Sequence, residues 1–321
     1  MKEKICDRVY RVVHPLPYDL KMVNCYLIEE DDGYTMIDTS DYLEKSCEIW
    51  QQVLDKPLKK IVLTHAHPDH FGLTPWLVEK YGAEVIMSKK GYEEYLYRKS
   101  MFNDNGVFHD RMYLFLNDYI FWADTGISKD YNNSKSFNFE PDLLFEPGDV
   151  LDLGGLPFKA IWTPGHSPDH FCFYNEELKL LFLGDHILEE INPIVLPSLK
   201  LRNPLNSYLA SFDDLLTLEI DYALPGHLSL IHNFTERVGR LRKRYEARWS
   251  QILTAMDAVP LLTEEITSKL YPHAIDEQFT AAAMQTITNL VYLESQGIVK
   301  KQKTDTYYRF YKNASLSGKY D

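Results

Sequence analysis

Residues 64–70 read Thr-His-Ala-His-Pro-Asp-His, which places three imidazoles and one carboxylate within seven consecutive positions. The overlapping run Lys60–Thr64 (KIVLT) is mainly apolar and β-branched, and it predicts a buried strand. Side chains at the end of a strand can converge above the edge of its sheet. Imidazole nitrogens and carboxylate oxygens are ligands for zinc, iron and manganese. The segment therefore predicts a metal site formed by His65, His67, Asp69 and His70.

Three further residues stand where a predicted strand ends. His166 follows Phe158–Trp162, Asp185 follows Leu180–Leu183, and His227 follows Tyr222–Leu224. A glycine precedes each of the three, which suits a backbone bend that turns the side chain inward. Together with the first segment they supply seven nitrogen or oxygen ligands, enough for two metal ions that share one carboxylate.

The remaining histidines are expected to have other roles. Isolated histidines are more often structural or surface residues than ligands, and we interpret His14, His109, His232 and His273 in that way. His170 and His186 lie beside ligand positions without matching them. We expect both to make hydrogen bonds around the site.

The ordered motifs HxHxDH, TPGHS, GD and PGH resemble those of the metallo-β-lactamase superfamily over residues 8–235. The resemblance implies an α+β fold, a four-layer αββα sandwich whose two facing sheets carry the site at one rim. It also implies the ligand sets: His65, His67 and His166 for a first metal, Asp69, His70 and His227 for a second, and Asp185 as the bridge. Asp38 matches a family position that supports the ligands from behind.

The metals determine the expected chemistry. Two divalent cations about 3.5–4 Å apart lower the pKa of a shared water and stabilise the developing oxyanion. The expected reaction is therefore hydrolysis, with Asp69 as the side chain that orients the water or accepts its proton. We expect two divalent ions; zinc is favoured, and iron and manganese remain alternatives because all three accept this ligand set.

Departures from the family pattern narrow the substrate class. Asp185 stands where the commonest zinc β-lactamases have a cysteine. Only 41 residues separate Asp185 from His227, too few for the domain inserted there in the RNA-processing nucleases. His67 stands where the flavodiiron oxidoreductases have a glutamate, and this sequence lacks their flavodoxin domain. These departures disfavour antibiotic hydrolysis, RNA processing by a nuclease of that type, and flavodiiron redox chemistry.

Three segments are similar to the glyoxalase II-like branch, and in particular to its lactamase-beta-like group with a C-terminal winged-helix-like domain: Gly184–Leu188, Asn203–Leu209 and Leu224–His227. This similarity favours hydrolysis of thioesters or esters. The first alternative is a metal-dependent phosphodiesterase or single-strand endoribonuclease. The second is a non-catalytic binding protein that retains the fold.

Residues 1–234 form the expected catalytic domain, and within it residues 88–140 differ in composition. They contain 13 aromatic side chains in 53 positions, which predicts a helical insertion. Their 7 basic and 8 acidic residues offer no cationic track for a nucleic acid. The insertion is either an aromatic lid that binds an acyl group near the metals or a helix packed against the domain.

Residues 235–321 form the second expected domain, with 13 basic and 10 acidic residues against 21 and 37 in residues 1–234. Helices at 236–256, 263–270 and 278–295 and a hairpin of 298–302 with 307–311 describe a winged-helix-like module. Its third helix has no lysine or arginine, which disfavours sequence-specific DNA binding. Packing on the catalytic domain, or on a second subunit in a homodimer, is favoured instead. A basic run forms either a solvated helix face or a contact for an anionic substrate, RNA included: Arg237, Arg240, Arg242, Lys243, Arg244 and Arg248.

Composition and charge limit the class of protein, its partners and its compartment. The chain has 321 residues, 45% of them apolar, so it can bury a large core. A net charge of −13 disfavours broad attraction to phosphate backbones or anionic membranes. Four isolated cysteines, with no signal peptide and no long apolar segment, favour a cytoplasmic protein without a membrane span. The expected partner is a small-molecule substrate, acyl or anionic.

Overall fold

The computed structural model describes residues 2–17, 20–101, 118–119, 134–256, 259–304 and 306–313. Most of the predicted insertion at 88–140, with its role as a lid or a packed helix, lies outside these residues. The described residues group into two compact units. One is drawn from 2–101, 134–193 and 216–234, and the other from 118–119, 194–215 and 235–313. The predicted domains 1–234 and 235–321 stay a prediction.

The first unit begins with a seven-stranded sheet whose strands follow chain order. They are β1 (Lys2–Cys6), β2 (Val9–Pro15), β3 (Met22–Glu30), β4 (Gly33–Ile37), β5 (Leu58–Val62), β6 (Glu84–Ser88) and β7 (Leu143–Phe145). Strands β1 to β4 pair antiparallel, and β4 to β7 pair parallel. Strand β3 has two buried faces, because Cys25 and Leu27 pack on one side and Tyr26 and Ile28 on the other.

The second sheet of this unit has five strands in the order β12-β11-β10-β9-β8. They are β8 (Val150–Leu153), β9 (Leu156–Trp162), β10 (Phe171–Asn175), β11 (Leu180–Gly184) and β12 (Tyr222–Pro225). Gly154 and Gly155, both at positive φ, form the predicted turn between β8 and β9. Strand β12 runs parallel to β11, so the loops that follow these two strands leave the sheet at the same edge.

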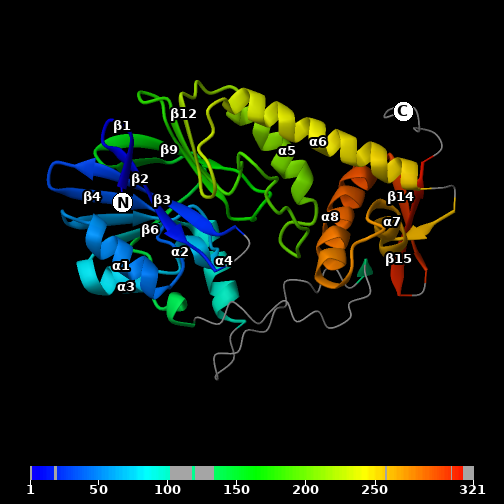
Figure 1. The fold of residues 1–321 in the computed structure, drawn as a ribbon, viewed down its shortest axis with the longest axis horizontal. Helices are drawn as coiled ribbons and strands as arrows, with labels where there is room; N and C mark the ends of the chain where they lie inside the picture. The colour runs from blue at the N-terminus through cyan, green and yellow to red at the C-terminus, as the bar shows by residue number, and fades with distance from the viewer. Residues whose placement is uncertain are drawn as a thin grey trace. The chain divides into compact units, whose positions relative to one another are not determined.

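Two apolar cores lie on the two faces of the seven-stranded sheet. One joins that sheet to α1 (Glu44–Val53), α3 (Thr74–Tyr81) and α4 (Lys89–Lys99), with Trp50 and Leu77 fully buried. The other joins the two sheets through aromatic side chains that include Phe158, Phe173 and Phe182. In Figure 1, α1 and α3 lie on one side of the blue strands and the green strands of the second sheet lie on the other. The predicted α+β sandwich of facing sheets is confirmed.

The second unit is mainly helical. It contains α5 (Pro204–Leu215), α6 (Phe234–Ala255), α7 (Thr263–Leu270), α8 (Asp276–Ser295) and a small sheet in the order β13-β15-β14. Its strands are β13 (Leu261–Leu262), β14 (Val299–Thr304) and β15 (Tyr307–Lys312). The helices and hairpin after residue 234 begin and end within two residues of their predicted bounds. Their winged-helix character stays a prediction. Within the described ranges, no helix combines the length and apolar character that crossing a membrane requires.

The sequence does not predict β1, β7 and β13. Strand β1 reads Lys-Glu-Lys-Ile-Cys and lies at the edge of its sheet, where charged side chains are tolerated and hide the apolar alternation. Strands β7 and β13 have three and two residues, which is too short for a periodic pattern to emerge.

Candidate metal centre

All seven predicted ligands come from segments that follow strands of the first unit. His65 and His67 follow β5, and Asp69 and His70 lie on the short helix α2 (Pro68–Phe71). His166 follows β9, Asp185 follows β11 and His227 follows β12. Pro68 is the first residue of α2, where its fixed φ suits a helix start and its missing N–H costs no hydrogen bond. The chain thus turns immediately after His67 and brings Asp69 and His70 back toward the strand ends.

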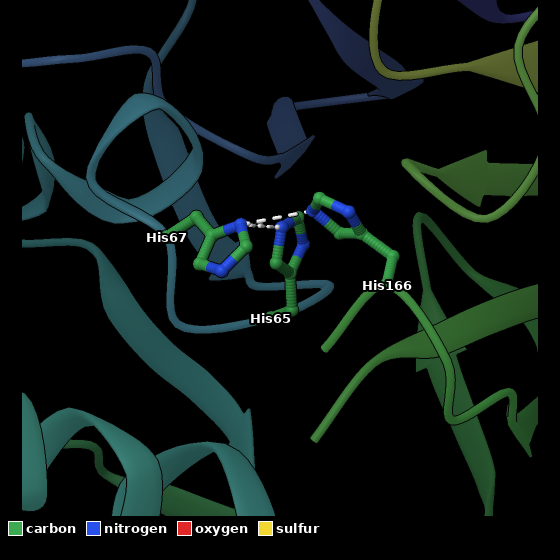
Figure 2. A group of neighbouring side chains, drawn as sticks. All are labelled: His65, His67 and His166. Carbon is green, nitrogen blue, oxygen red and sulfur yellow. Dashed lines mark hydrogen bonds between the residues drawn. The ribbon is translucent and has the colours of Figure 1, made fainter. Parts of the chain in front are cut away.

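The first group of predicted ligands is formed by His65, His67 and His166, which we call the three-histidine cluster. The Nδ1 atom of His67 lies 2.9 Å from Nε2 of His65 and 2.9 Å from Nε2 of His166. Figure 2 shows one nitrogen of each ring directed toward a common point. Burial lowers the pKa of His65 and of His67 well below the usual value. Both imidazoles are therefore neutral and keep a lone pair for a cation.

The second group is formed by Asp69, His70 and His227, which we call the aspartate cluster. The Nε2 atom of His227 lies 3.3 Å from Nε2 of His70 and 3.3 Å from Oδ2 of Asp69. Burial lowers the pKa of His227, but the carboxylates of Asp185 and Asp69 outweigh it and raise the pKa to about 10. The pKa of His70 is raised in the same way. The carboxylates thus favour positive charge in this cluster.

Asp185 touches both clusters. Its Oδ2 lies 3.4 Å from Nε2 of His166 and 3.2 Å from Nε2 of His227, and its Oδ1 lies 3.3 Å from Nε2 of His70. A carboxylate in this position can offer one oxygen to each of two ions. The two clusters and Asp185 together offer five imidazoles and two carboxylates. Within each cluster the ligand atoms lie close enough to bind one ion, so this donor set fits two divalent cations.

Glycines make room for this arrangement at two places. A Cβ at Gly226 would lie 2.5 Å from Oδ1 of Asp185 and 2.8 Å from Cε1 of His70. Gly184 has φ of +47°, and a Cβ there would lie 2.6 Å from Nε2 of His170. Both positions therefore exclude a side chain where the ligand loops approach most closely.

Asp38 supports the ligands from behind, at the position that the resemblance indicates. Its carboxylate accepts the Thr64 N–H at 2.9 Å, the Thr64 hydroxyl at 2.8 Å and the His70 Nδ1–H at 2.7 Å. The Thr64 hydroxyl in turn accepts Nδ1–H of His65 at 2.9 Å. These bonds leave Nε2 of His65 and of His70 facing the clusters, which fixes the tautomer that a metal ligand needs.

Hydrogen bonds that involve backbone groups orient two more of the predicted ligands. Nε2 of His170 accepts the Asp185 N–H at 3.0 Å, while its Nδ1–H donates to the Thr163 hydroxyl at 2.8 Å. The Nδ1–H of His227 donates to the Met22 carbonyl at 2.5 Å. His170 therefore makes the hydrogen bonds expected of it.

Sequence reasoning missed Asp169 and the pair of Glu94 and Arg98 on α4. Burial, and next the charge of Glu94, raise the pKa of Asp169 to about 6. Arg98 Nε lies 3.2 Å from Oε1 of Glu94, and both side chains are largely buried. The i, i+4 spacing of that pair and the carboxylate in the His166 motif are visible in the sequence, but their burial beside the ligands is not.

The isolated histidines lie apart from the clusters. His14 is buried against Trp50, with ring centroids 4.6 Å apart, and burial lowers its pKa to about 3. His232 and His273 are exposed, and His109 lies outside the described residues. His186 is buried 5.8 Å from the ring of His170.

Comparisons with known proteins agree with this geometry. A family model described as Metallo-beta-lactamase superfamily matches residues 18–227. A relative from Caenorhabditis elegans, a beta-lactamase-like protein 2 homolog, is 23% identical over 95% of this chain and 90% of its own length. An atrochrysone carboxyl ACP thioesterase from Pseudocercospora fijiensis is 23% identical over 94% of this chain and 79% of its own length. The crystal structure of a beta-lactamase domain protein from Burkholderia ambifaria superposes with a TM-score of 0.82 at 23% identity, covering 97% of this chain and 93% of that one.

Proposed function

The chain belongs to the metallo-β-lactamase superfamily and is a metal-dependent hydrolase, and from this premise we propose that it uses two divalent ions to hydrolyse thioesters or esters. The observation that carries the proposal is the position of Asp185, whose two oxygens lie within 3.4 Å of ligand nitrogens from both clusters. The three-histidine cluster would hold one ion and the aspartate cluster the other. Zinc is favoured over iron and manganese.

When bound, two such ions lower the pKa of a shared water and stabilise negative charge on the carbonyl oxygen under attack. We assign to Asp69 the role of accepting the proton of the attacking water. Its carboxylate contacts His227 and is 13% exposed, whereas that of Asp185 is 5% exposed. Asp69 can therefore meet an entering water, orient it and accept its proton.

The substrate class is supported by a relative's name. The Pseudocercospora fijiensis relative, whose match covers nearly all of this chain, is named a thioesterase. A thioester or ester carbonyl has the acyl carbon and polarisable oxygen on which this chemistry acts. Residues 88–140 would add an apolar surface for the acyl group if they form the lid and not the packed helix, the two roles that their composition leaves open.

The alternative, a phosphodiesterase or single-strand endoribonuclease, would need free cations along the nucleic acid. Two members of the basic run on α6 are instead paired with carboxylates: Arg240 with Glu236 at 2.8 Å, and Arg242 with Asp213 at 2.6 Å. On α8, Thr288 is buried and donates to the Val195 carbonyl at 2.8 Å. The two ion pairs support a solvated helix face over a nucleic-acid contact, the Thr288 contact lies within the second unit, and a homodimer stays open.

A parallel assay tests the proposal. Short- and long-chain acyl thioesters and single-stranded RNA are offered to the full chain, with and without a chelator. We expect thioester turnover that the chelator abolishes, and a fall of about 10²-fold or more in kcat/KM for Asp185→Ala. The control is Asp152→Ala, which removes an exposed aspartate from β8. Metal-dependent cleavage of RNA without thioester turnover would favour the alternative.

A further inference from the structure

Asp169 lies three residues after His166 and is 1% exposed, so its carboxylate is almost entirely surrounded by protein. Its Oδ2 accepts the backbone N–H of Ala66 at 2.7 Å, and its Oδ1 accepts the hydroxyl of Ser167. Ala66 stands between His65 and His67, and Ser167 directly follows His166. One carboxylate therefore joins the two loops that carry all three members of the three-histidine cluster.

A carboxylate is the side chain that this position requires. A backbone N–H and a hydroxyl both donate here, and an ionised carboxylate accepts at both oxygens. An asparagine accepts at one atom only, so it could keep the Ala66 N–H only if the Ser167 hydroxyl turned to accept from its NH₂ group, whereas alanine removes both acceptors. Hydrogen bonds to a buried carboxylate are also stronger than those to a neutral amide.

The contacts of Asp169 complement those of Asp38. Asp38 binds His70 directly and reaches His65 through Thr64, so it acts on the aspartate cluster and on one side of the loop 64–70. The backbone bond from Phe171 N–H to the Thr64 carbonyl, 2.9 Å long, joins the same two chain segments just before His65. Asp169 holds them together further along, at the residue between the two ligands of the HxH pair.

We propose that Asp169 is a positioning residue that holds the loop of His65 and His67 against the loop of His166, so that the three-histidine cluster is formed before a metal binds. The inference rests on the proposed function, because forming the three-histidine cluster in advance is useful only if that cluster binds a metal. The arrangement of the loops is a property of the metal-depleted chain and can be measured there.

The first test follows amide hydrogen exchange in the metal-depleted full chain, for wild type and Asp169→Ala. We expect exchange in residues 64–68 to rise by about tenfold or more, because the Ala66 N–H loses its acceptor, while residues 222–227 stay unchanged. The matched control is Asp142→Ala, which removes a carboxylate that accepts the Val85 N–H at 2.8 Å, away from the ligand loops. Wild-type exchange at residues 64–68 in Asp169→Ala, or an equal rise throughout the chain, would overturn the proposal.

The second test titrates cobalt into the same proteins and follows its visible spectrum. Asp169→Ala should weaken the first binding event about 10- to 100-fold, the usual effect of removing a group that orients ligands. If this variant does not fold, Ser167→Ala and Ser167→Thr decide the matter: alanine should give the same defects to a smaller degree, and threonine, which keeps the hydroxyl, should restore both readouts. Equal behaviour of alanine and threonine would contradict the inference. If wild type binds no cobalt but its hydrogen exchange still differs from that of the Asp169 variant, the proposed metal centre is contradicted and the contact between the loops is retained.

Discussion

Asp38 satisfies three donors at once, two from Thr64 and one from His70, and it has a positive φ of 57°. A non-glycine residue in that conformation is strained unless its surroundings hold it there. The three hydrogen bonds provide that restraint. At the scale of a single residue, the carboxylate therefore favours the tautomers of His65 and His70 that present Nε2 to the clusters.

Asp38→Asn should separate that role from general stability. An amide can accept at one atom only, so His70 or Thr64 loses its partner, and we expect metal affinity to fall about 10- to 100-fold. Competition with a chromophoric chelator measures this. Asp55→Asn is the matched control, because Asp55 also accepts two side-chain donors, Tyr34 and Lys2, yet lies away from the ligands. Equal affinity losses in both variants would contradict the assignment.

His14 gives a pH effect that is independent of the metals. Within the part of the chain that the structure describes, neither ring nitrogen has a hydrogen-bond partner. Its pKa of about 3 lies below the usual value near 6.5, so between these values the unfolded chain takes up a proton that the folded chain does not. The contribution of His14 to stability is therefore complete above pH 6.5 and is lost progressively as the pH falls toward 3.

His14→Phe should remove this pH dependence while keeping a ring against Trp50. From pH 7 to pH 5, the free energy of unfolding of wild type should fall by about 2 kcal/mol more than that of the variant. Urea denaturation of metal-depleted protein at both pH values measures the difference. Parallel losses in the two proteins would show that His14 does not remain neutral in the fold.

Residue types alone indicated the seven predicted ligands, because their motifs and spacings are local. The sequence did not indicate Asp169 or the pair of Glu94 and Arg98, and the reason is physical. Their importance lies in burial and in bonds to backbone groups such as the Ala66 N–H, and a backbone donor has no residue type to recognise. The position of Asp38 was available only through the family resemblance.

At the scale of elements, the loop after β12 carries His227 and is held by side chains of β3. The Asn24 side chain donates to the carbonyls of Pro225 and Leu228, both at 3.0 Å, and the Tyr26 hydroxyl donates to the Pro225 carbonyl at 2.6 Å. Strand β3 thus fixes a loop that is about 200 residues away in sequence. Such contacts make the loop rigid, so a side chain added at Gly226 could not be accommodated by a backbone shift without breaking them.

Gly226→Ala should therefore reduce metal binding by more than half while leaving the strands intact. The new Cβ would lie 2.5 Å from Asp185 Oδ1, which forces the proposed bridging carboxylate aside. Elemental analysis after dialysis should find fewer than half the wild-type equivalents, with an unchanged far-ultraviolet circular dichroism spectrum. Gly239→Ala is the control, since no atom lies within 4 Å of its Cβ and alanine in a helix should stabilise by about 0.5–1 kcal/mol. Full metal content in Gly226→Ala would refute the close approach.

Most elements followed from periodicity, because the internal strands are short apolar runs and the helices have apolar stripes. The failures lie at sheet edges. Strand β1 carries Lys2, Glu3 and Lys4 and is paired on one side only, so its strand character depends on β2 more than on its own pattern. The hairpin β14–β15 has longer strands than expected, since pairing extends from Val299↔Lys312 to Thr304↔Tyr307.

For the whole molecule, the sandwich was predicted through the family resemblance that the ordered motifs carry. The membership of each sheet did not follow from those motifs. The parallel pairing of β11 with β12 joins residues about 40 positions apart, and no local pattern encodes it. The sequence shows the aromatic residues of the core between the sheets, but only the structure shows that Phe158, Phe173 and Phe182 pack together.

Anomalous diffraction at the zinc edge, from crystals of the zinc-loaded full chain, tests the central claim most directly. We expect two peaks about 3.5–4 Å apart, one within bonding distance of the three-histidine cluster, the other of the aspartate cluster, with Asp185 between them. A map with no peak at these residues, or with zinc bound elsewhere, would contradict the claim that these seven side chains hold a pair of metal ions.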